Sequence, residues 1–134
     1  MPKFSSKSLT KLESCHEDLQ KLFHEVITKF DCTIIEGHRS NERQNELFKS
    51  SKSKLKGGFS KHNKTPSLAI DVAPYHTRTP HIDWNKIENF HLFAGYVLAT
   101  ADKLDINIRW GGSWDQTLDT RNNKFNDLVH FELV

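Results

Sequence analysis

Three residues from separate parts of the chain have side chains that could hold a metal ion. Asp71 lies in the apolar segment 68–72, where alternation along a strand turns it away from the apolar face, between two alanines. His130 alternates in the same way with the apolar residues of the last segment, and His62 lies shortly before the Asp71 segment. Two imidazole nitrogens and one carboxylate oxygen are a sufficient protein donor set for a catalytic zinc ion, with the fourth position left for water.

A zinc site of this kind also needs a base, because zinc lowers the pKa of its water toward about 7 and the protons must then be handled. Asp127 stands three residues before His130, which places it within reach of that water without making it a ligand. Spacing alone leaves a plainer alternative open for each residue. Asp71 could face water from an edge strand, His130 could be an ordinary polar-face residue, and His62 could be a solvated loop residue. Eight histidines in 134 residues make accidental pairs easy.

Size and composition exclude several classes of protein. The 134 residues, with a mass of 15.5 kDa, predict a single domain over 1–134. The 19 basic and 17 acidic residues give a net charge of +2, too balanced to indicate a nucleic-acid partner. No apolar run approaches the roughly 20 residues that cross a bilayer, and the polar segment 1–10 does not resemble a signal peptide. The two cysteines form neither a disulfide framework nor a zinc-ligand spacing, which predicts that the protein is made in a reducing cytoplasm.

Periodicity predicts the elements that must position these residues. In the first half we expect a helix over 6–29, a strand over 32–35, a short helix over 41–49 and a strand over 68–72. Asn41 and Gln44 would form the capping box of the short helix, and 49–64 would be a loop.

In the second half we expect a helix from 84 to 104 with Asp83 as its N-cap, a strand over 106–110 and a closing strand over 128–134. The segment 113–126 is polar and is predicted to be a loop. The order of elements predicts an α+β fold, with helices packed on a small, largely antiparallel sheet.

Several motifs resemble those of the zinc D-alanyl-D-alanine carboxypeptidase and L-alanyl-D-glutamate endopeptidase family, whose small members include bacteriophage endolysins. The motifs are Gly37-His38-Arg39-Ser40, Ser60-Lys61-His62-Asn63, Pro66-Ser67-Leu68-Ala69-Ile70-Asp71-Val72-Ala73-Pro74-Tyr75 and Asp127-Leu128-Val129-His130. Two more, Ile82-Asp83-Trp84 and Trp110-Gly111-Gly112-Ser113-Trp114, resemble the phage branch. The resemblance runs from about residue 33 to the C-terminus. One departure is the longer spacer between His62 and Asp71, which carries Pro66-Ser67 where many members have a glycine.

The resemblance implies a role for each residue of the site. His62, Asp71 and His130 would bind one zinc ion per chain. Asp127 would be the general base that activates water and then passes the proton to the leaving amine. Arg39 would polarise the scissile carbonyl and stabilise the oxyanion, which suits its permanent charge.

Two other residues and one loop are candidates for contact with substrate. Ser60 could orient the loop or hydrogen-bond the pocket, and Gln44 could face the cleft or be solvated. The loop that precedes the Asp71 strand is rich in lysine, which is usually a sign of a solvated segment but could attract anionic cell-envelope polymers. Its lysines are Lys49, Lys52, Lys54, Lys56, Lys61 and Lys64.

We therefore expect a zinc metallopeptidase that cuts peptidoglycan stem peptides as a monomeric phage lysis enzyme, and the bond we expect it to cut is the L-alanyl–D-glutamate bond. It would accumulate in the host cytoplasm, without a signal peptide or membrane insertion, and reach the wall through a holin-type pore. A D-alanyl-D-alanine carboxypeptidase or dipeptidase would use the same zinc site. A non-catalytic zinc-bearing wall-binding module is the third alternative, against which Asp127 and Arg39 both argue.

Overall fold

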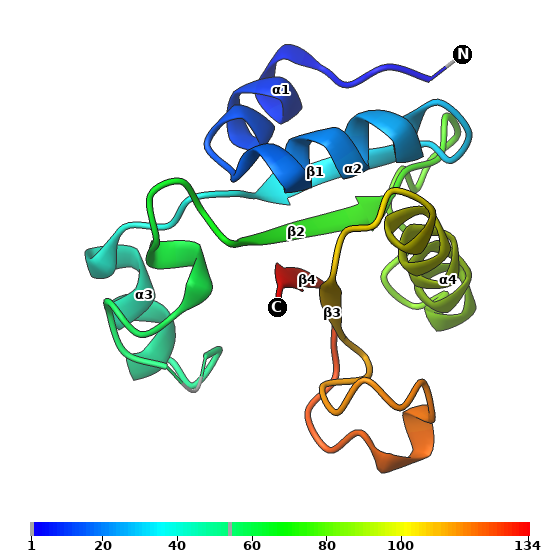
Figure 1. Cartoon of the computed structure of the whole chain (residues 1–134). Helices are drawn as coiled ribbons and strands as arrows, with labels where there is room; N and C mark the ends of the chain where they lie inside the picture. Colours follow the sequence, from blue (N-terminus) through cyan, green and yellow to red (C-terminus); the bar gives the residue numbers. More distant parts are fainter. Residues whose placement is uncertain (1, 54) are drawn as a thin grey trace.

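A four-stranded sheet with helices packed around it forms the framework of the molecule (Figure 1). The computed structural model describes residues 2–53 and 55–134, so Lys54 of the lysine-rich loop lies outside the described residues. The helices are α1 (Ser6–Glu13), α2 (Glu17–Ile27), α3 (Asn41–Lys49) and α4 (Ile87–Lys103), with 3₁₀ turns η1 (Lys61–Asn63) and η2 (Thr120–Asn122). The strands are β1 (Cys32–Glu36), β2 (Ala69–Pro74), β3 (Ile108–Gly111) and β4 (Asp127–Leu133).

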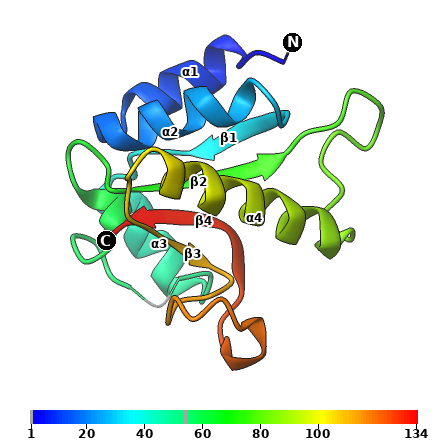
Figure 2. The same cartoon turned by 45° about the vertical axis from the view of Figure 1, so that its right-hand side comes forward.

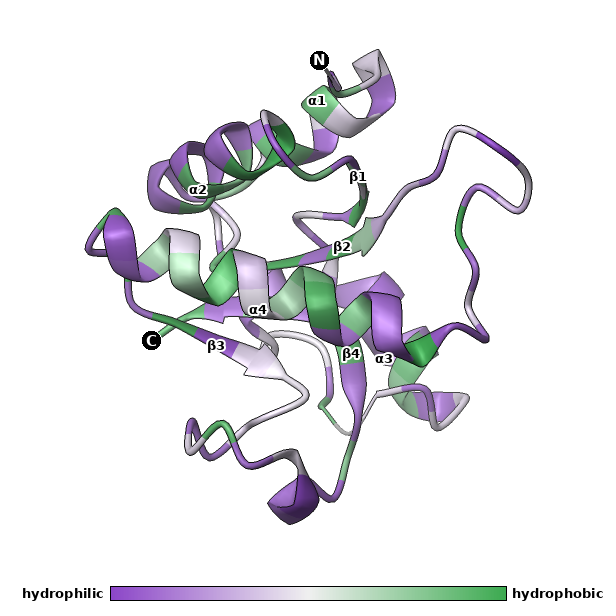
Figure 3. Ribbon diagram, turned by 90° about the vertical axis from the view of Figure 1, so that its right-hand side faces the viewer, coloured by the Kyte–Doolittle hydropathy of each residue, from purple (hydrophilic) through white to green (hydrophobic). Residues whose placement is uncertain are grey.

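All strand pairs are antiparallel, in the order β1-β2-β4-β3, which confirms the predicted α+β class. Two long helices, α2 and α4, cover one face of this sheet (Figures 2 and 3). Their apolar sides pack on Ile70, Val72 and Phe131, and Phe131 makes edge contacts with Phe23 and Phe93. The core therefore lies on the helical side, and the alternate residues of β2 and β4 are left for the opposite face.

Two irregularities in strand pairing alter which side chains reach the face opposite the core. Ile34 pairs with Val72, but a bulge then places Glu36, not Ile35, opposite Asp71. A second shift brings Gly111 of β3 opposite Asp127 directly after Trp110 has paired with Phe131, so that residues 128–130 of β4 have no register partner on β3. Bulges commonly re-aim side chains next to functional sites, and here they bring two carboxylates to the Asp71 face.

The prediction of one helix over 6–29 was wrong, because the chain breaks into α1 and α2 at Ser14–His16. The backbone of this short link pairs with Ser67: His16 N–H donates to the Ser67 carbonyl at 2.8 Å, and Ser67 N–H donates to the Ser14 carbonyl at 3.0 Å. His16 then caps α2, because its Nδ1 accepts from Asp18 N–H. A helical period continues through such a break, so the apolar pattern does not reveal it.

The helix starts also differ from the predictions. Ser40, not Asn41, caps α3, because its hydroxyl accepts from Arg43 N–H. Helix α4 begins at Ile87 and not at 84, since Asp83 accepts from Asn85 N–H in a turn that precedes the helix. Cys15 and Cys32 are buried and free, as expected for two cysteines without a disulfide framework. None of the helices in the described part of the chain is long and apolar enough to cross a membrane.

Candidate metal centre

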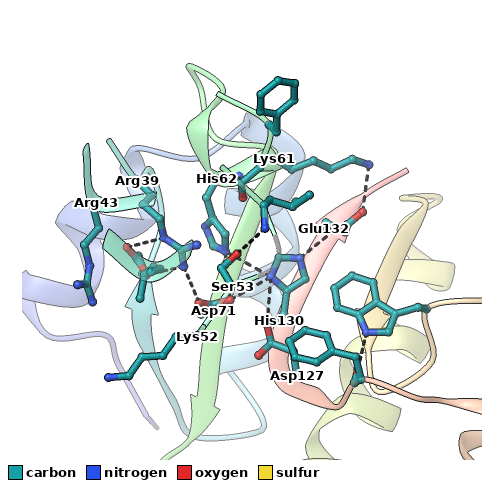
Figure 4. A pocket seen from close by; sticks show the side chains of 17 residues that line it. Arg39, Arg43, Lys52, Ser53, Lys61, His62, Asp71, Asp127, His130 and Glu132 are labelled. Atoms are coloured by element: carbon teal, nitrogen blue, oxygen red, sulfur yellow. Dashed lines mark hydrogen bonds and ion pairs between the residues drawn. The ribbon is translucent and has the colours of Figure 1, made fainter. Parts of the chain in front are cut away.

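His62, Asp71 and His130 converge at one point on the sheet face opposite the core (Figure 4). His62 Nε2 lies 3.2 Å from Asp71 Oδ1 and 3.3 Å from His130 Nδ1, and His130 Nδ1 lies 3.2 Å from Asp71 Oδ1. All three residues are buried. Three ligand atoms of the types that bind divalent metal ions thus meet from three different segments of the chain.

Strand pairing and a capped turn explain why the three meet. Asp71 on β2 pairs directly with His130 on β4, so both side chains leave the same face. Strand β2 lies inside the sheet, which excludes the edge-strand alternative for Asp71. His62 is held above them by η1, where Ser60 caps the turn and His62 carbonyl accepts from Arg39 N–H at 2.8 Å.

The outer nitrogen of each histidine is already occupied. His62 Nδ1 lies 2.8 Å from the Gly37 carbonyl, and His130 Nε2 lies 2.9 Å from Glu132 Oε1. Because a carbonyl and a carboxylate only accept, each outer nitrogen carries its proton, and a neutral ring then presents a lone pair at the other nitrogen. Metal-binding histidines usually have such an outer partner, so both rings are oriented as ligands would be.

The charges of the cluster also fit a cation. Burial would raise the pKa of Asp71, but hydrogen bonds from His130 and His62 outweigh it and hold that pKa well below its usual range. Burial would lower the pKa of His130, but its bonds to Asp71 and Glu132 raise it to about 9. Both shifts reflect attraction between the Asp71 carboxylate and positive charge beside it. A zinc ion would supply such a charge to the same donor set.

Asp127 lies beside the cluster without joining it. Its Oδ2 is 4.0 Å from His130 Nδ1, and the side chain is partly exposed. The neighbouring β3 residue must be glycine here, since a side chain on Gly111 would collide with the Asp127 backbone. Burial and, after it, the negative charge of Asp71 raise the pKa of Asp127. A half-buried carboxylate with a raised pKa is suited to accepting and returning a proton.

Arg39 reaches the cluster from the other side. Its Nε and Nη2 donate to the two oxygens of Glu36 at 3.0 and 2.7 Å, and Nη2 lies 3.5 Å from Asp71 Oδ2. Its Nη1 donates to Gln44 Oε1 at 2.8 Å. Four of the five N–H bonds are thereby used, and one on Nη1 has no partner among the described residues. The guanidinium is rigidly held and keeps a single donor for a further acceptor.

Gln44 does not face the cleft, in contrast to the substrate-binding role considered for it. The side chain is fully buried, and its Nε2 donates to Ser53 Oγ at 2.8 Å and to the Leu55 carbonyl at 2.6 Å. Gln44 therefore links Arg39 to the loop that contains Ser53 and Leu55. Ser60 does line the cavity, but it is buried and its hydroxyl accepts from His62 N–H, so it orients the turn that carries His62.

Glu132 is the residue of the site that sequence analysis missed. Besides holding His130, its Oε2 lies 3.2 Å from Lys61 Nζ and 3.9 Å from Arg109 Nε. Burial opposes ionisation, but the hydrogen bond from His130 and the charge of Lys61 lower the pKa of Glu132. The signal for it was present, since Glu132 follows His130 by two residues on the same strand face.

A cavity of about 500 Å³ opens over the cluster. Trp114 forms part of its wall, with the indole 5.2 Å from the His130 ring and Nε1 donating to the Phe125 carbonyl. Trp110, by contrast, is buried in the core. His62, Asp71 and His130 form its floor, and its volume lies in the range typical of ligand-binding pockets.

Comparison with known proteins places this geometry in context. The L-Ala D-Glu endopeptidase ChiX of Serratia marcescens is 24% identical with a TM-score of 0.76, covering 99% of this chain and 91% of that one. The LdcB LD-carboxypeptidase is 20% identical with a TM-score of 0.56, covering 88% and 56%. The D,D-pentapeptidase VanY from a VanB-type vancomycin resistance cassette, solved with Zn(II), is 19% identical with a TM-score of 0.54, covering 88% and 69%.

These likenesses establish a shared fold. No curated protein gives a significant match. The family model described as phage L-alanyl-D-glutamate peptidase matches residues 1–134. Since the match extends over the whole chain, this protein belongs to the phage L-alanyl-D-glutamate peptidase family.

Proposed function

We propose that His62, Asp71 and His130 bind one zinc ion, with which this peptidoglycan hydrolase cleaves the L-alanyl–D-glutamate bond of stem peptides. The observation that carries the proposal is the convergence of the three ligand atoms on the cavity floor, with Asp127 and Arg39 on opposite sides (Figure 4). A structural zinc site would require neither of the two flanking residues. Family membership supports the choice of bond.

When bound, zinc would act as a Lewis acid and lower the pKa of water. Asp127 accepts a proton from the attacking water as its oxygen bonds to the scissile carbonyl carbon. Arg39 directs its remaining N–H to the carbonyl oxygen, where negative charge develops. As the carbon–nitrogen bond breaks, Asp127 returns the proton to the amine of D-glutamate. The products are a carboxylate on L-alanine and a free amine on D-glutamate, so atoms and charges balance.

Removal of the metal tests the proposal. Dialysis against a chelator should abolish hydrolysis of purified peptidoglycan, and one equivalent of zinc should restore it. Elemental analysis of the reconstituted protein should find one zinc per chain. Hydrolysis that survives thorough chelation would contradict the zinc mechanism, and stoichiometric zinc without any hydrolysis would instead favour a wall-binding module.

Arg39→Ala should lower turnover by about 100- to 1,000-fold, the usual effect of losing one oxyanion donor, while zinc stoichiometry stays near one. Asp71 keeps both of its histidine partners in this variant, so the ligand cluster is retained. Arg39→Lys should recover only part of the turnover, because an ammonium cannot reproduce the planar fork with which Arg39 binds both oxygens of Glu36. Steady-state kinetics with zinc analysis checks this. Unchanged turnover in Arg39→Ala would remove Arg39 from the reaction.

Glu132→Gln should weaken zinc binding by about 10- to 100-fold, because the amide no longer fixes the proton of His130 on Nε2. Competition with a chromophoric chelator measures the affinity independently of activity. Glu88→Gln is the matched control, since Glu88 is exposed and, among the described residues, its ion pair is with Lys86 on the surface. Equal zinc affinity in both variants would show that Glu132 does not position the ligand.

We further propose that the chain acts as a monomeric single domain, 1–134, on the cell wall after release from the host cytoplasm through a holin-type pore. The family match over residues 1–134 supports the domain assignment and the lysis role. Size-exclusion chromatography with light scattering tests the monomer, for which a mass near 15.5 kDa is expected.

A further inference from the structure

Among the charged residues that line the cavity, the acidic ones are all paired within the site and some of the basic ones are not. Each of its acidic residues has a partner within the site. Glu36 pairs with Arg39 at 2.7 Å, and Asp71 bonds to both histidines. Glu132 pairs with Lys61, and Asp127 lies 4.0 Å from His130. The acidic residues of the cavity therefore pair with two of its lining cations, Arg39 and Lys61. Two other lining cations have no acidic partner within the cavity.

The two remaining cations are Arg43 and Lys52. Both line the cavity, Arg43 from α3 and Lys52 from the loop that follows it. Arg43 has only an exposed pair with Glu46, at 3.6 Å, and Lys52 has no ion pair with any residue in the described ranges. Figure 4 shows both on the same side of the ligand cluster as Arg39, with Asp127 on the other side. This side of the cavity is therefore suited to an anionic part of the substrate.

Peptide geometry places a carboxylate on that side. In a trans peptide bond, the carbonyl oxygen and the Cα that follows the nitrogen lie on the same side of the carbon–nitrogen bond. If the scissile oxygen faces Arg39, the Cα of D-glutamate is also directed toward the Arg39 side. D-Glutamate is linked onward through its side chain in the stem peptide, so this Cα carries a free carboxylate. In D-isoglutamine the same position is a neutral amide.

We propose that Arg43 and Lys52 form a carboxylate subsite that binds the free α-carboxylate of D-glutamate, so that the enzyme prefers stem peptides with D-glutamate over those with D-isoglutamine. The proposal rests on the proposed function and adds a specificity determinant to it. Charge-assisted bonds from an arginine and a lysine favour a carboxylate over an amide of the same shape. Both side chains are exposed, so their replacement leaves the fold and the metal ligands intact.

The test compares two synthetic muramyl tripeptides that differ only in D-glutamate or D-isoglutamine at the second position. The wild type, reconstituted with zinc, should cleave the D-glutamate peptide with a kcat/KM about tenfold higher, as expected for charge-assisted bonds at a partly exposed site. Arg43→Gln/Lys52→Gln should lose this preference by losing activity on the D-glutamate peptide alone. Lys49→Gln/Lys56→Gln removes two positive charges from the same segment outside the cavity lining and should keep the preference.

Several results would overturn the subsite. Equal cleavage of the two peptides by the wild type would contradict it, and so would an equal loss on both peptides in the double variant. The same pair of peptides is also made with lysine in place of diaminopimelate as the third residue. A double-variant effect that depends on the third residue and not on the second would assign the two cations to another carboxylate and exclude the proposal. If the wild type cleaves neither peptide, the proposed function fails first, and the two failures are thereby distinguished.

Discussion

Asp127→Asn should keep its zinc and lose about two to four orders of magnitude in turnover, the usual contribution of a general base. The substitution preserves shape and removes basicity. The three ligand atoms of His62, Asp71 and His130 meet without Asp127, whose Oδ2 lies 4.0 Å from the nearest ligand nitrogen. The variant should therefore still bind zinc, but the attacking water should have no base to accept its proton. Zinc analysis and single-turnover kinetics on the same preparation measure the two effects.

Asp115→Asn is the control for Asp127→Asn, since Asp115 is exposed and the bonds it makes within the described residues are to its neighbours Ser113 and Thr117. Asp115→Asn should retain both its zinc and its turnover. Loss of zinc from Asp127→Asn would contradict the prediction. That outcome would make Asp127 a ligand, close the fourth position and leave the reaction without a base.

His130→Ala should weaken zinc binding by at least about a hundredfold, because loss of a ligand costs more than loss of its outer partner. The substitution also leaves Glu132 without its histidine, between Lys61 and Arg109. Hydrolysis should fall to background at equimolar zinc. Affinity is measured by chelator competition, and circular dichroism establishes that the variant is folded.

Two variants make the His130 result specific. Asp71→Asn should also weaken zinc, by removing the charged donor of the same cluster. His24→Ala should not, because His24 is exposed on α2 and contacts only Phe4 among the ring pairs of the described residues. A His130→Ala protein that still binds one zinc with wild-type affinity would refute the ligand set.

The convergence of His62, Asp71 and His130 could be predicted because it depends on local patterns. Alternation along β2 and β4 turns Asp71 and His130 away from the apolar residues, and the antiparallel pairing then brings them together. The Ser60–Asn63 turn carries its own capping signal. Spacing had already suggested His62 and Asp127, with plainer alternatives left open for the candidate ligands, and the motif resemblance favoured the site over those alternatives and added the role of Arg39.

The supporting residues could not be predicted because they depend on tertiary contacts. Glu36 pairs with Asp71 because of a bulge in β1, and no residue type in the sequence predicts that bulge. Gln44 looked like a cap or a cleft residue, yet it is buried because Arg39 and the Leu55 carbonyl both need its amide. The break between α1 and α2 similarly depends on Ser67, about fifty residues away in the sequence.

Mass spectrometry of purified muropeptides, after incubation with the zinc-reconstituted protein, tests the central claim most directly. Cleavage at the L-alanyl–D-glutamate bond should release the disaccharide carrying L-alanine and a peptide that begins with D-glutamate. Loss of D-alanine from the C-terminal end would contradict this account and indicate a D-alanyl-D-alanine carboxypeptidase. Intact muropeptides in the presence of stoichiometric zinc would contradict enzymatic function altogether.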